Sequence, residues 1–246
     1  MDRLLYISSV GLSNIERAQA ARANNLANAS TPGFRADLAR ITSTEVESGD
    51  TYASRVYAVN QGAGVDLSAG SQTETGRDLD VAIDGEGFLT VLDSEGKEAY
   101  SRDGRLSVDS LGRLLNAQGA QLMGRGGPVA LPPYESLLIG SDGAITIRPQ
   151  GQGPEALVVV DHLKLVKPPS VEIHKAANGL LYGAQDVYQV DESVAVNSGF
   201  IETSNVNAIN ELTEILSLSR QFELEVRLMK TAETNDEAAS QLLRIG

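Results

Sequence analysis

The sequence contains no cysteine and no tryptophan, only two histidines, and 4% aromatic residues. Without cysteine the chain forms no disulfide, carries no thiolate nucleophile and offers no cysteine ligand to a metal. A hydrophobic content of 41% still allows a packed core, built mainly from Leu, Val, Ile and Ala. The 246 residues are sufficient for one large domain or two small ones.

The net charge of −13 repels nucleic-acid phosphates and anionic lipid surfaces, so neither is expected as a partner. No apolar run is long enough to span a bilayer, and direct membrane insertion is not expected. The N-terminal apolar run is short, and the amphipathic pattern continues beyond it with Glu16 and Arg17. We therefore expect no cleavable secretory signal.

The first thirty residues are predicted to form a helix that ends at Thr31-Pro32-Gly33, because proline disfavours helical backbone at the preceding residue. Small and apolar residues recur at helical spacing in two adjacent stripes. The first stripe is Leu4, Ile7, Gly11, Ala18 and Ala21, and the second is Leu5, Leu12, Ile15 and Leu26. Together they form a face wider than a single partner helix requires.

A longer helix is predicted from about 207 to 244, with Ser204, Asn205 and Asn207 as acceptable N-caps. Its apolar residues follow a 3–4 spacing with one polar interruption, typical of a coiled-coil seam. The seam residues are Leu212, Ile215, Ser219, Phe222, Val226 and Met229. Further leucines lie off this seam, which indicates contacts on several sides of the helix; they are Leu216, Leu218, Leu224 and Leu228.

The central region from 78 to 189 has the turns and short apolar runs of an antiparallel β domain. The predicted hairpin turns are Asp84-Gly85, Asp103-Gly104, Asp142-Gly143 and Asn178-Gly179. The predicted strands are 81–83, 88–92, 106–108, 145–147, 157–160 and 163–166. Residues 36–77 are rich in Ser, Thr, Gly and Asp, and we interpret them as an extended arm with one strand at 55–60 that rests on a neighbour.

The expected fold class is therefore α+β. The N- and C-terminal helices (1–35 and 205–246) pair as a coiled-coil layer and form an assembly domain. An extended connecting arm (36–77 and 190–204) joins them to the central all-β domain (78–189). Apolar surface left over from the helix pair favours contacts with other subunits.

No residue pattern indicates catalysis, and no catalytic, cofactor-binding or metal-binding residues are expected. His162 and His174 have no further histidine or cysteine to complete a metal site. The acidic residues Asp78, Asp80 and Asp84 do not have EF-hand spacing. A β-rich carbohydrate-active enzyme that uses two carboxylates stays open as an alternative, although such sites usually include aromatic residues. A self-contained binding module with stapled helices is the other alternative.

Asparagines cluster where the first helix ends and where the last begins. Asn24, Asn25 and Asn28 are expected to satisfy the last carbonyls of the helix and to allow the bend. The segment 199–207 carries the chain back into the C-terminal helix. Because one asparagine would suffice at an ordinary helix end, this number indicates a shared, packed junction.

These segments resemble the signatures of bacterial flagellar rod and hook proteins. The N-terminal one is Asn24-Asn25-Leu26-Ala27-Asn28 with Thr31-Pro32-Gly33-Phe34-Arg35, and the C-terminal one is Gly199-Phe200-Ile201-Glu202-Thr203-Ser204-Asn205-Val206-Asn207. Residues 79–89, 100–106, 109–114 and 119–124 are similar to central motifs of the same family, in order along nearly the whole chain. The Met1-Asp2-Arg3 start, the size and the short arm are most similar to proximal-rod members, with distal-rod members as the alternative.

The resemblance implies a structural subunit of the hollow rod that crosses the periplasm in the flagellar basal body. It implies export through the flagellar type III apparatus, and assembly with other copies and with neighbouring proximal and distal rod proteins. No cofactor is implied. The residues expected at the assembly interface are Leu4, Ile7, Gly11, Ile15, Ala18, Asn24, Asn25, Leu26, Asn28, Pro32, Gly33, Phe34, Ser204, Asn205, Val206, Asn207, Leu212, Ile215, Phe222, Val226 and Met229.

Overall fold

A computed structural model describes residues 2–38, 41–45, 56–60, 64–153 and 156–245; the side chains of 2–7, 41–45, 56–60, 236 and 239–245 lie outside this description. The chain forms two compact units. The first comprises Met1–Ala27, Asp37–Gly64 and Asn207–Gly246, and the second comprises Asn28–Ala36 and Val65–Val206. The predicted α+β class is confirmed.

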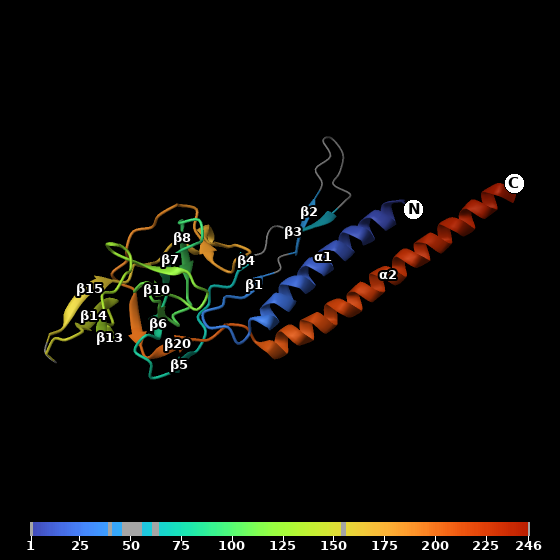
Figure 1. The fold of residues 1–246 in the computed structure, drawn as a ribbon. Coiled ribbons are helices and arrows are strands. Elements are labelled where there is room, and N and C mark those ends of the chain that lie inside the picture. The colour runs from blue at the N-terminus through green and yellow to red at the C-terminus, as the bar shows by residue number, and fades with distance from the viewer. Residues whose placement is uncertain (1, 39–40, 46–55, 61–63, 154–155, 246) are drawn as a thin grey trace. The chain divides into compact units, whose positions relative to one another are not determined.

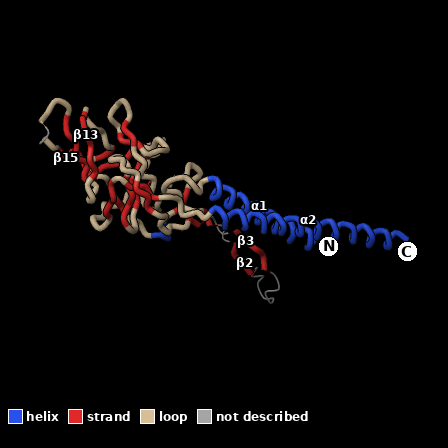
Figure 2. Tube along the Cα trace, turned by 90° about the horizontal axis from the view of Figure 1, so that it is seen from below, coloured by secondary structure: helices blue, strands red, loops and turns tan. Residues whose placement is uncertain are grey.

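The first unit consists mainly of helix α1 (Asp2–Ala27) and helix α2 (Ala208–Ile245). They lie side by side and run in opposite directions (Figures 1 and 2). At 1.5 Å per residue, the 38 residues of α2 extend about 57 Å. Asn207 caps α2: its side-chain oxygen accepts hydrogen bonds from the N–H groups of Ile209 and Asn210, at 3.1 and 3.2 Å.

Short paired strands lie among the described residues between α1 and the β unit. Strands β2 (Ile41–Glu45) and β3 (Val56–Asn60) pair antiparallel, with Ile41 opposite Asn60. The strand predicted at 55–60 is confirmed for Val56–Asn60, and Arg55 lies outside the described residues. The short strand β1 (Asp37–Leu38) pairs with β4 (Gly64–Val65).

The second unit is the predicted antiparallel β domain. Its largest sheet has nine strands, seven of them in the order β17-β18-β8-β7-β11-β10-β9, while β12 pairs with β11 and β16 pairs with β7. These strands are β7 (Phe88–Leu92), β8 (Glu98–Ser101), β9 (Ser107–Val108), β10 (Leu114–Leu115), β11 (Gln121–Gly124), β12 (Gly127–Pro128), β16 (Leu165–Val166), β17 (His174–Lys175) and β18 (Leu181–Tyr182). A 3-10 turn, η1 (Ser170–Glu172), precedes β17.

Three smaller sheets complete this unit. The order β13-β14-β15 joins Tyr134–Ile139, Ala144–Pro149 and Val158–His162. Strand β6 (Val81–Asp84) pairs with β19 (Ala195–Ser198), and β5 (Gln72–Glu74) pairs with β20 (Phe200–Glu202). The residues that precede α2 are thus built into the β unit.

Aliphatic side chains fill the core of the β unit, as expected for a chain without tryptophan. Val81, Val91, Leu122 and Ile145 are fully buried in one cluster with Val196, which β19 contributes. A smaller cluster contains Phe88, Tyr100, Val166, Leu181 and Tyr188. The rings of Tyr100 and Tyr188 meet edge to face, with centroids 5.8 Å apart.

Two of the four predicted hairpin turns join paired strands. Asp142-Gly143 connects β13 to β14, and Asn178-Gly179 connects β17 to β18; both glycines have positive φ. The hairpin prediction is wrong for Asp84-Gly85 and Asp103-Gly104, because the strands on either side pair with other partners. Turn chemistry marks a reversal of the chain, but the choice of strand partner is a long-range matter.

Candidate assembly interface

Within the first unit, one face of α1 and one face of α2 hold buried and half-buried residues at spacings of three or four. On α1 this face comprises Ser8, Gly11, Ile15, Ala18, Arg22 and Asn25, and Asn14 is also buried, next to Ile15. On α2 it comprises Glu211, Ile215, Leu218, Phe222, Glu225, Met229 and Ala232. Two contacts show that these faces meet. Arg22 forms an ion pair with Glu211 at 3.0 Å, and a Cβ placed on Gly11 would lie 3.7 Å from the Glu225 carboxyl carbon.

This contact includes charged and small residues besides apolar ones. Glu211 is 6% exposed, and one of its carboxylate oxygens receives a hydrogen bond from Arg22. Its other oxygen has no hydrogen-bond partner within the described part of the chain. Buried polar contacts of this kind fix the register of paired helices at some cost in stability.

The predicted α2 seam is divided between two faces. Ile215, Phe222 and Met229 are half-buried on the α1 side, whereas Leu212 and Val226 are 49% and 41% exposed. Leu212 and Val226 share a spacing of three and four residues with Ile209 and Leu216; the intervening positions are Ser219 and Glu223. We call Ile209, Leu212, Leu216 and Val226 the outer stripe. The role of these residues in assembly stays a prediction.

The other predicted α1 residues have varied environments. Leu4 and Ile7 lie in α1, but their side chains are outside the description. Leu26 is half-buried. Asn25 is fully buried, and its amide exchanges two hydrogen bonds with the backbone of Asp37, at 2.8 and 3.0 Å, rather than closing the helix end. The Asn24 side chain donates a hydrogen bond to the carboxylate of Asp37, at 2.6 Å.

In the second unit, the residues after α1 form a tight turn. The Asn28 side chain accepts a hydrogen bond from the Thr31 hydroxyl at 3.1 Å. Gly33 has a φ of +68°, and a Cβ at this position would lie 2.2 Å from the carbonyl carbon of Arg102. Its N–H donates to the carbonyl of Glu202 at 2.8 Å. Position 33 therefore requires glycine both for its backbone conformation and for its close approach to a neighbouring segment.

A buried charge cluster lies beside this turn. The Glu202 carboxylate, 1% exposed, accepts hydrogen bonds from Arg35 at 2.6 Å, from Arg102 at 2.9 Å and from the N–H of Gly70 at 2.7 Å. Burial lowers the pKa of Arg102, opposed by the Glu202 charge. Two cations and one anion meet here, and Nε and Nη1 of Arg35 have no hydrogen-bond partner among the described residues.

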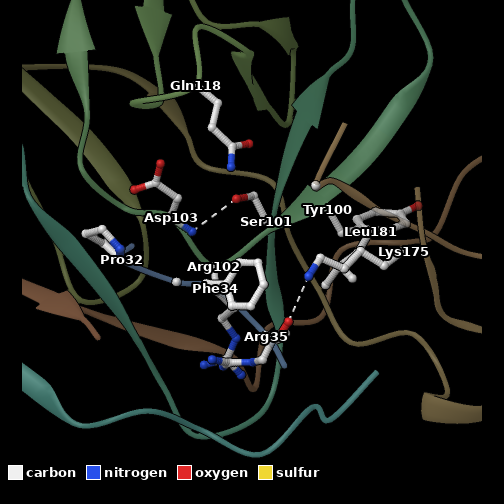
Figure 3. Close-up of a pocket in the computed structure, with 12 residues that line it drawn as sticks. Pro32, Phe34, Arg35, Tyr100, Ser101, Arg102, Asp103, Gln118, Lys175 and Leu181 are labelled. Atoms are coloured by element: carbon white, nitrogen blue, oxygen red, sulfur yellow. Dashed lines mark hydrogen bonds between the residues drawn. The ribbon is translucent and has the colours of Figure 1, made fainter. Parts of the chain in front are cut away.

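Phe34 and Lys175 lie beside the same turn (Figure 3), and Asn205 is hydrogen-bonded to the residue that follows it, Ala36. Lys175 lies 3.6 Å from the centroid of the Phe34 ring and donates to the carbonyl of Arg35 at 2.9 Å. Asn205 accepts from the N–H of Ala36 at 2.8 Å and donates to carbonyls of the 65–70 segment. Pro32, Gly33 and Phe34 line a cavity of about 20 Å³ with Arg102, Asp103 and Gln118, large enough for a single water molecule.

Two further predicted residues lie just before α2 and receive local contacts. The hydroxyl of Ser204, which is largely buried, accepts a hydrogen bond from the N–H of Val206 at 3.2 Å. Val206 itself is half-buried. These two residues and Asn205 form the connection into the capped start of α2.

The charged residues of the cluster were missed as a group from the sequence. Arg35, Arg102 and Glu202 each end or lie inside a quoted motif, which was the available signal. Arg35 and Glu202 are 167 residues apart, so no sequence spacing indicates that they contact each other. Among the residues whose positions are described, no group of three or more His, Cys, Asp or Glu could hold a metal ion. In the same residues no helix has the length and apolar character needed to cross a membrane.

Comparison with known protein families places the chain in the class of flagellar rod and hook proteins. Three family signatures match in order. "Flagella basal body rod protein" matches residues 5–35, "Flagellar hook protein FlgE/F/G D1 domain" matches 82–147, and "Flagellar basal body rod FlgEFG protein C-terminal" matches 197–242.

The chain belongs to the flagellar basal-body rod protein family. It is 34% identical over 250 residues to the flagellar basal-body rod protein FlgF of Escherichia coli K12, with 99% of each chain covered. It is 28% identical over 253 residues to FlgF of Caulobacter vibrioides, covering 100% of each. The flagellar basal-body rod protein FlgG of Bacillus subtilis is 28% identical over 268 residues, covering 100% of this chain and 99% of FlgG.

Proposed function

We propose that this chain is a non-enzymatic structural subunit of the flagellar basal-body rod, in its proximal part, and that it polymerises through its terminal helices. The observation that carries the proposal is the outer stripe. α1 covers one face of α2, while Leu212, Leu216 and Ile209 stay exposed on another. An apolar stripe at coiled-coil spacing without a partner in its own chain is typical of a helix that packs against other subunits.

In this proposal α1 and α2 pair as a coiled coil, and the outer stripe contacts helices of other copies and of neighbouring rod proteins. Contacts between different faces of identical subunits do not close, and they generate a helical tube. The helical assembly domain would comprise 1–35 and 205–246, the arm 36–77 and 190–204, and the central β domain 78–189. The arm would rest on a neighbouring subunit.

The proposed location is the periplasm-spanning rod of the basal body, reached through the flagellar type III export apparatus. The chain would pass unfolded and order its helices on assembly, since helices with so polar a mutual contact are marginal alone. The absence of cysteine prevents disulfide cross-linking in the oxidising periplasm. Nucleic acid, cofactors and membrane insertion have no part in this function.

The outer stripe can be tested with two matched variants. Leu216 lies on the stripe and is 59% exposed, whereas Leu224 lies off it and is 58% exposed. Leu216→Asp is expected to abolish rod assembly in cells that lack the native protein, measured by motility and by isolation of basal bodies. Leu224→Asp removes the same side chain at the same exposure outside the stripe and is expected to impair assembly less. Normal rods from both variants would disprove the role of this face.

Amide hydrogen exchange of the purified, unassembled chain separates the subunit from the alternative of a self-contained binding module. We expect rapid exchange in α1 and α2 and protection in the β unit, followed by protection of the helices in isolated basal bodies. Helices as protected as the β unit in the free chain would favour the module. Cross-linking in basal bodies distinguishes a proximal from a distal position in the rod by the neighbours captured.

A further inference from the structure

The segments that leave α1 and lead into α2 meet within the β unit at one residue, Glu202. Its carboxylate binds Arg35, eight residues after the end of α1, and its own position lies six residues before the start of α2. It also binds Arg102 and the N–H of Gly70, which belong to two further segments. Its carbonyl accepts the N–H of Gly33. Four stretches of chain are therefore fastened by a single buried side chain.

The cluster lies inside the β unit rather than on its surface. Val196, in the strand next to Glu202, is 1% exposed in the main core, and Arg35 is itself 2% exposed. Removing the one anion would leave two buried guanidinium groups without a counter-charge, which is strongly unfavourable. The two segments are thus expected to be held together whenever the β unit is folded.

We propose that the Arg35–Glu202–Arg102 cluster is a clamp in the unassembled chain. It joins the segment after α1 to the segment before α2, with Glu202 as its positioning residue. Without the clamp, the segment after α1 would be free of the segment before α2, and a longer stretch of chain would separate the two helices. With the clamp closed they are tethered at adjacent points and meet at high local concentration, before any neighbouring subunit binds. The inference goes beyond the proposed function and does not rest on it, since the clamp acts in the free chain.

The size of the effect follows from loop length. Gly11 and Glu225 face each other in the helix pair. With residues 35 and 202 joined, the chain between them comprises 24 residues from Gly11 to Arg35 and 23 from Glu202 to Glu225, 47 in all. With Arg35 released, Glu202 is still paired with Gln72 across β5 and β20, and the chain comprises 61 residues from Gly11 to Gln72 and the same 23, 84 in all. Since the probability of loop closure falls as the 3/2 power of length, the clamp raises the local concentration of the helices about twofold.

The chain has no cysteine, so one introduced pair reports this concentration cleanly. In a Gly11→Cys/Glu225→Cys protein, the disulfide is equilibrated with glutathione, and its equilibrium constant gives the effective concentration of the two thiols. The full-length chain is compared with and without Glu202→Gln. Because the geometry of the pair is the same in each background, it cancels in the ratio. We expect Glu202→Gln to lower the effective concentration about twofold.

Glu98→Gln is the matched control. It breaks a largely buried ion pair elsewhere in the β unit, in which Lys164 lies 2.6 Å from Glu98, but it is not part of the clamp. We expect this variant to retain the parent value. A parent-like value in Glu202→Gln, or an equal fall in Glu98→Gln, would overturn the proposal.

Near-ultraviolet circular dichroism of the tyrosines reports whether the β unit is folded in each variant. If Glu202→Gln does not fold, Arg35→Met decides the question, because it opens the clamp while the Glu202 carboxylate keeps its hydrogen bonds from Arg102 and Gly70. A lower effective concentration in a folded Arg35→Met protein supports the clamp. A parent-like value in that folded protein overturns it.

Discussion

Replacing Gly33 with alanine tests the packing of the turn that follows α1. Its φ of +68° costs an alanine about 1–2 kcal/mol. The added Cβ would also lie 2.2–2.4 Å from backbone atoms of Arg102 and Asp103, which cannot move away as a flexible side chain could. Overpacking of this kind costs about 1–3 kcal/mol more. Together the free energy of unfolding of the β unit should fall by about 2–5 kcal/mol.

Gly119 provides the matched control, because its φ is +82° and a Cβ there would meet nothing within 4 Å. Gly119→Ala should therefore cost only the backbone contribution, about 1–2 kcal/mol. The assay is urea unfolding followed by tyrosine circular dichroism, with a slope of about 2 kcal/mol per molar urea. The midpoint of Gly33→Ala should lie about 0.5–1.5 M below that of Gly119→Ala.

Equal midpoints for the two alanine variants would refute the reasoning, since they would show that the close approach of position 33 to Arg102 contributes nothing. A change in the slope would indicate instead that the denatured or native state had changed in compactness. The two glycines share a backbone conformation and differ in their surroundings, so their difference isolates the tertiary contact.

Two further substitutions have definite expected outcomes. Gly11→Ala should stabilise α1 by about 0.5–1 kcal/mol, because alanine is the better helix former and the nearest atom to its Cβ lies 3.7 Å away. The measurement is amide hydrogen exchange in α1, which should become slower. Faster exchange would contradict the prediction. Burial raises the pKa of Tyr100 to about 12, above its ordinary value of 10.0. Because this tyrosine ionises first in the unfolded chain, its ionisation leaves the free energy of unfolding unchanged below pH 10 and lowers it by about 2–3 kcal/mol between pH 10 and 12. Tyr100→Phe should reduce this alkaline loss in urea titrations from pH 8 to 12, and an unchanged pH profile would show that other groups cause it.

The helices and most strands were predictable because their signals are local. The spacing of apolar residues predicted a helix from about 207 to 244, and α2 occupies Ala208–Ile245. Strand β7 coincides with the apolar run Phe88–Leu92. Hydrogen bonds within a helix and the steric preferences of turn residues act between residues close in sequence, so a pattern a few residues long is sufficient.

The face of α2 that meets α1 was not predictable in the same way. Apolarity alone favoured a seam through Leu212 and Val226, whereas α1 packs over positions that include Glu211 and Glu225. Arg22 forms an ion pair with Glu211, and Gly11, which has no side chain, leaves room for the side chain of Glu225. Those contacts depend on residues about 190 positions away along the chain, which helical periodicity does not encode.

The sequence by itself determined the element types, the absence of thiol chemistry and, through its terminal motifs, the family. The tertiary structure alone decided that Glu202 would be the meeting point of Arg35 and Arg102, and that the segment before α2 would complete the β unit. The physical reason is the separation along the sequence over which the interactions act. Secondary structure depends on neighbours along the chain, whereas a buried carboxylate is stable only where the fold brings cations and backbone donors to it from several distant segments.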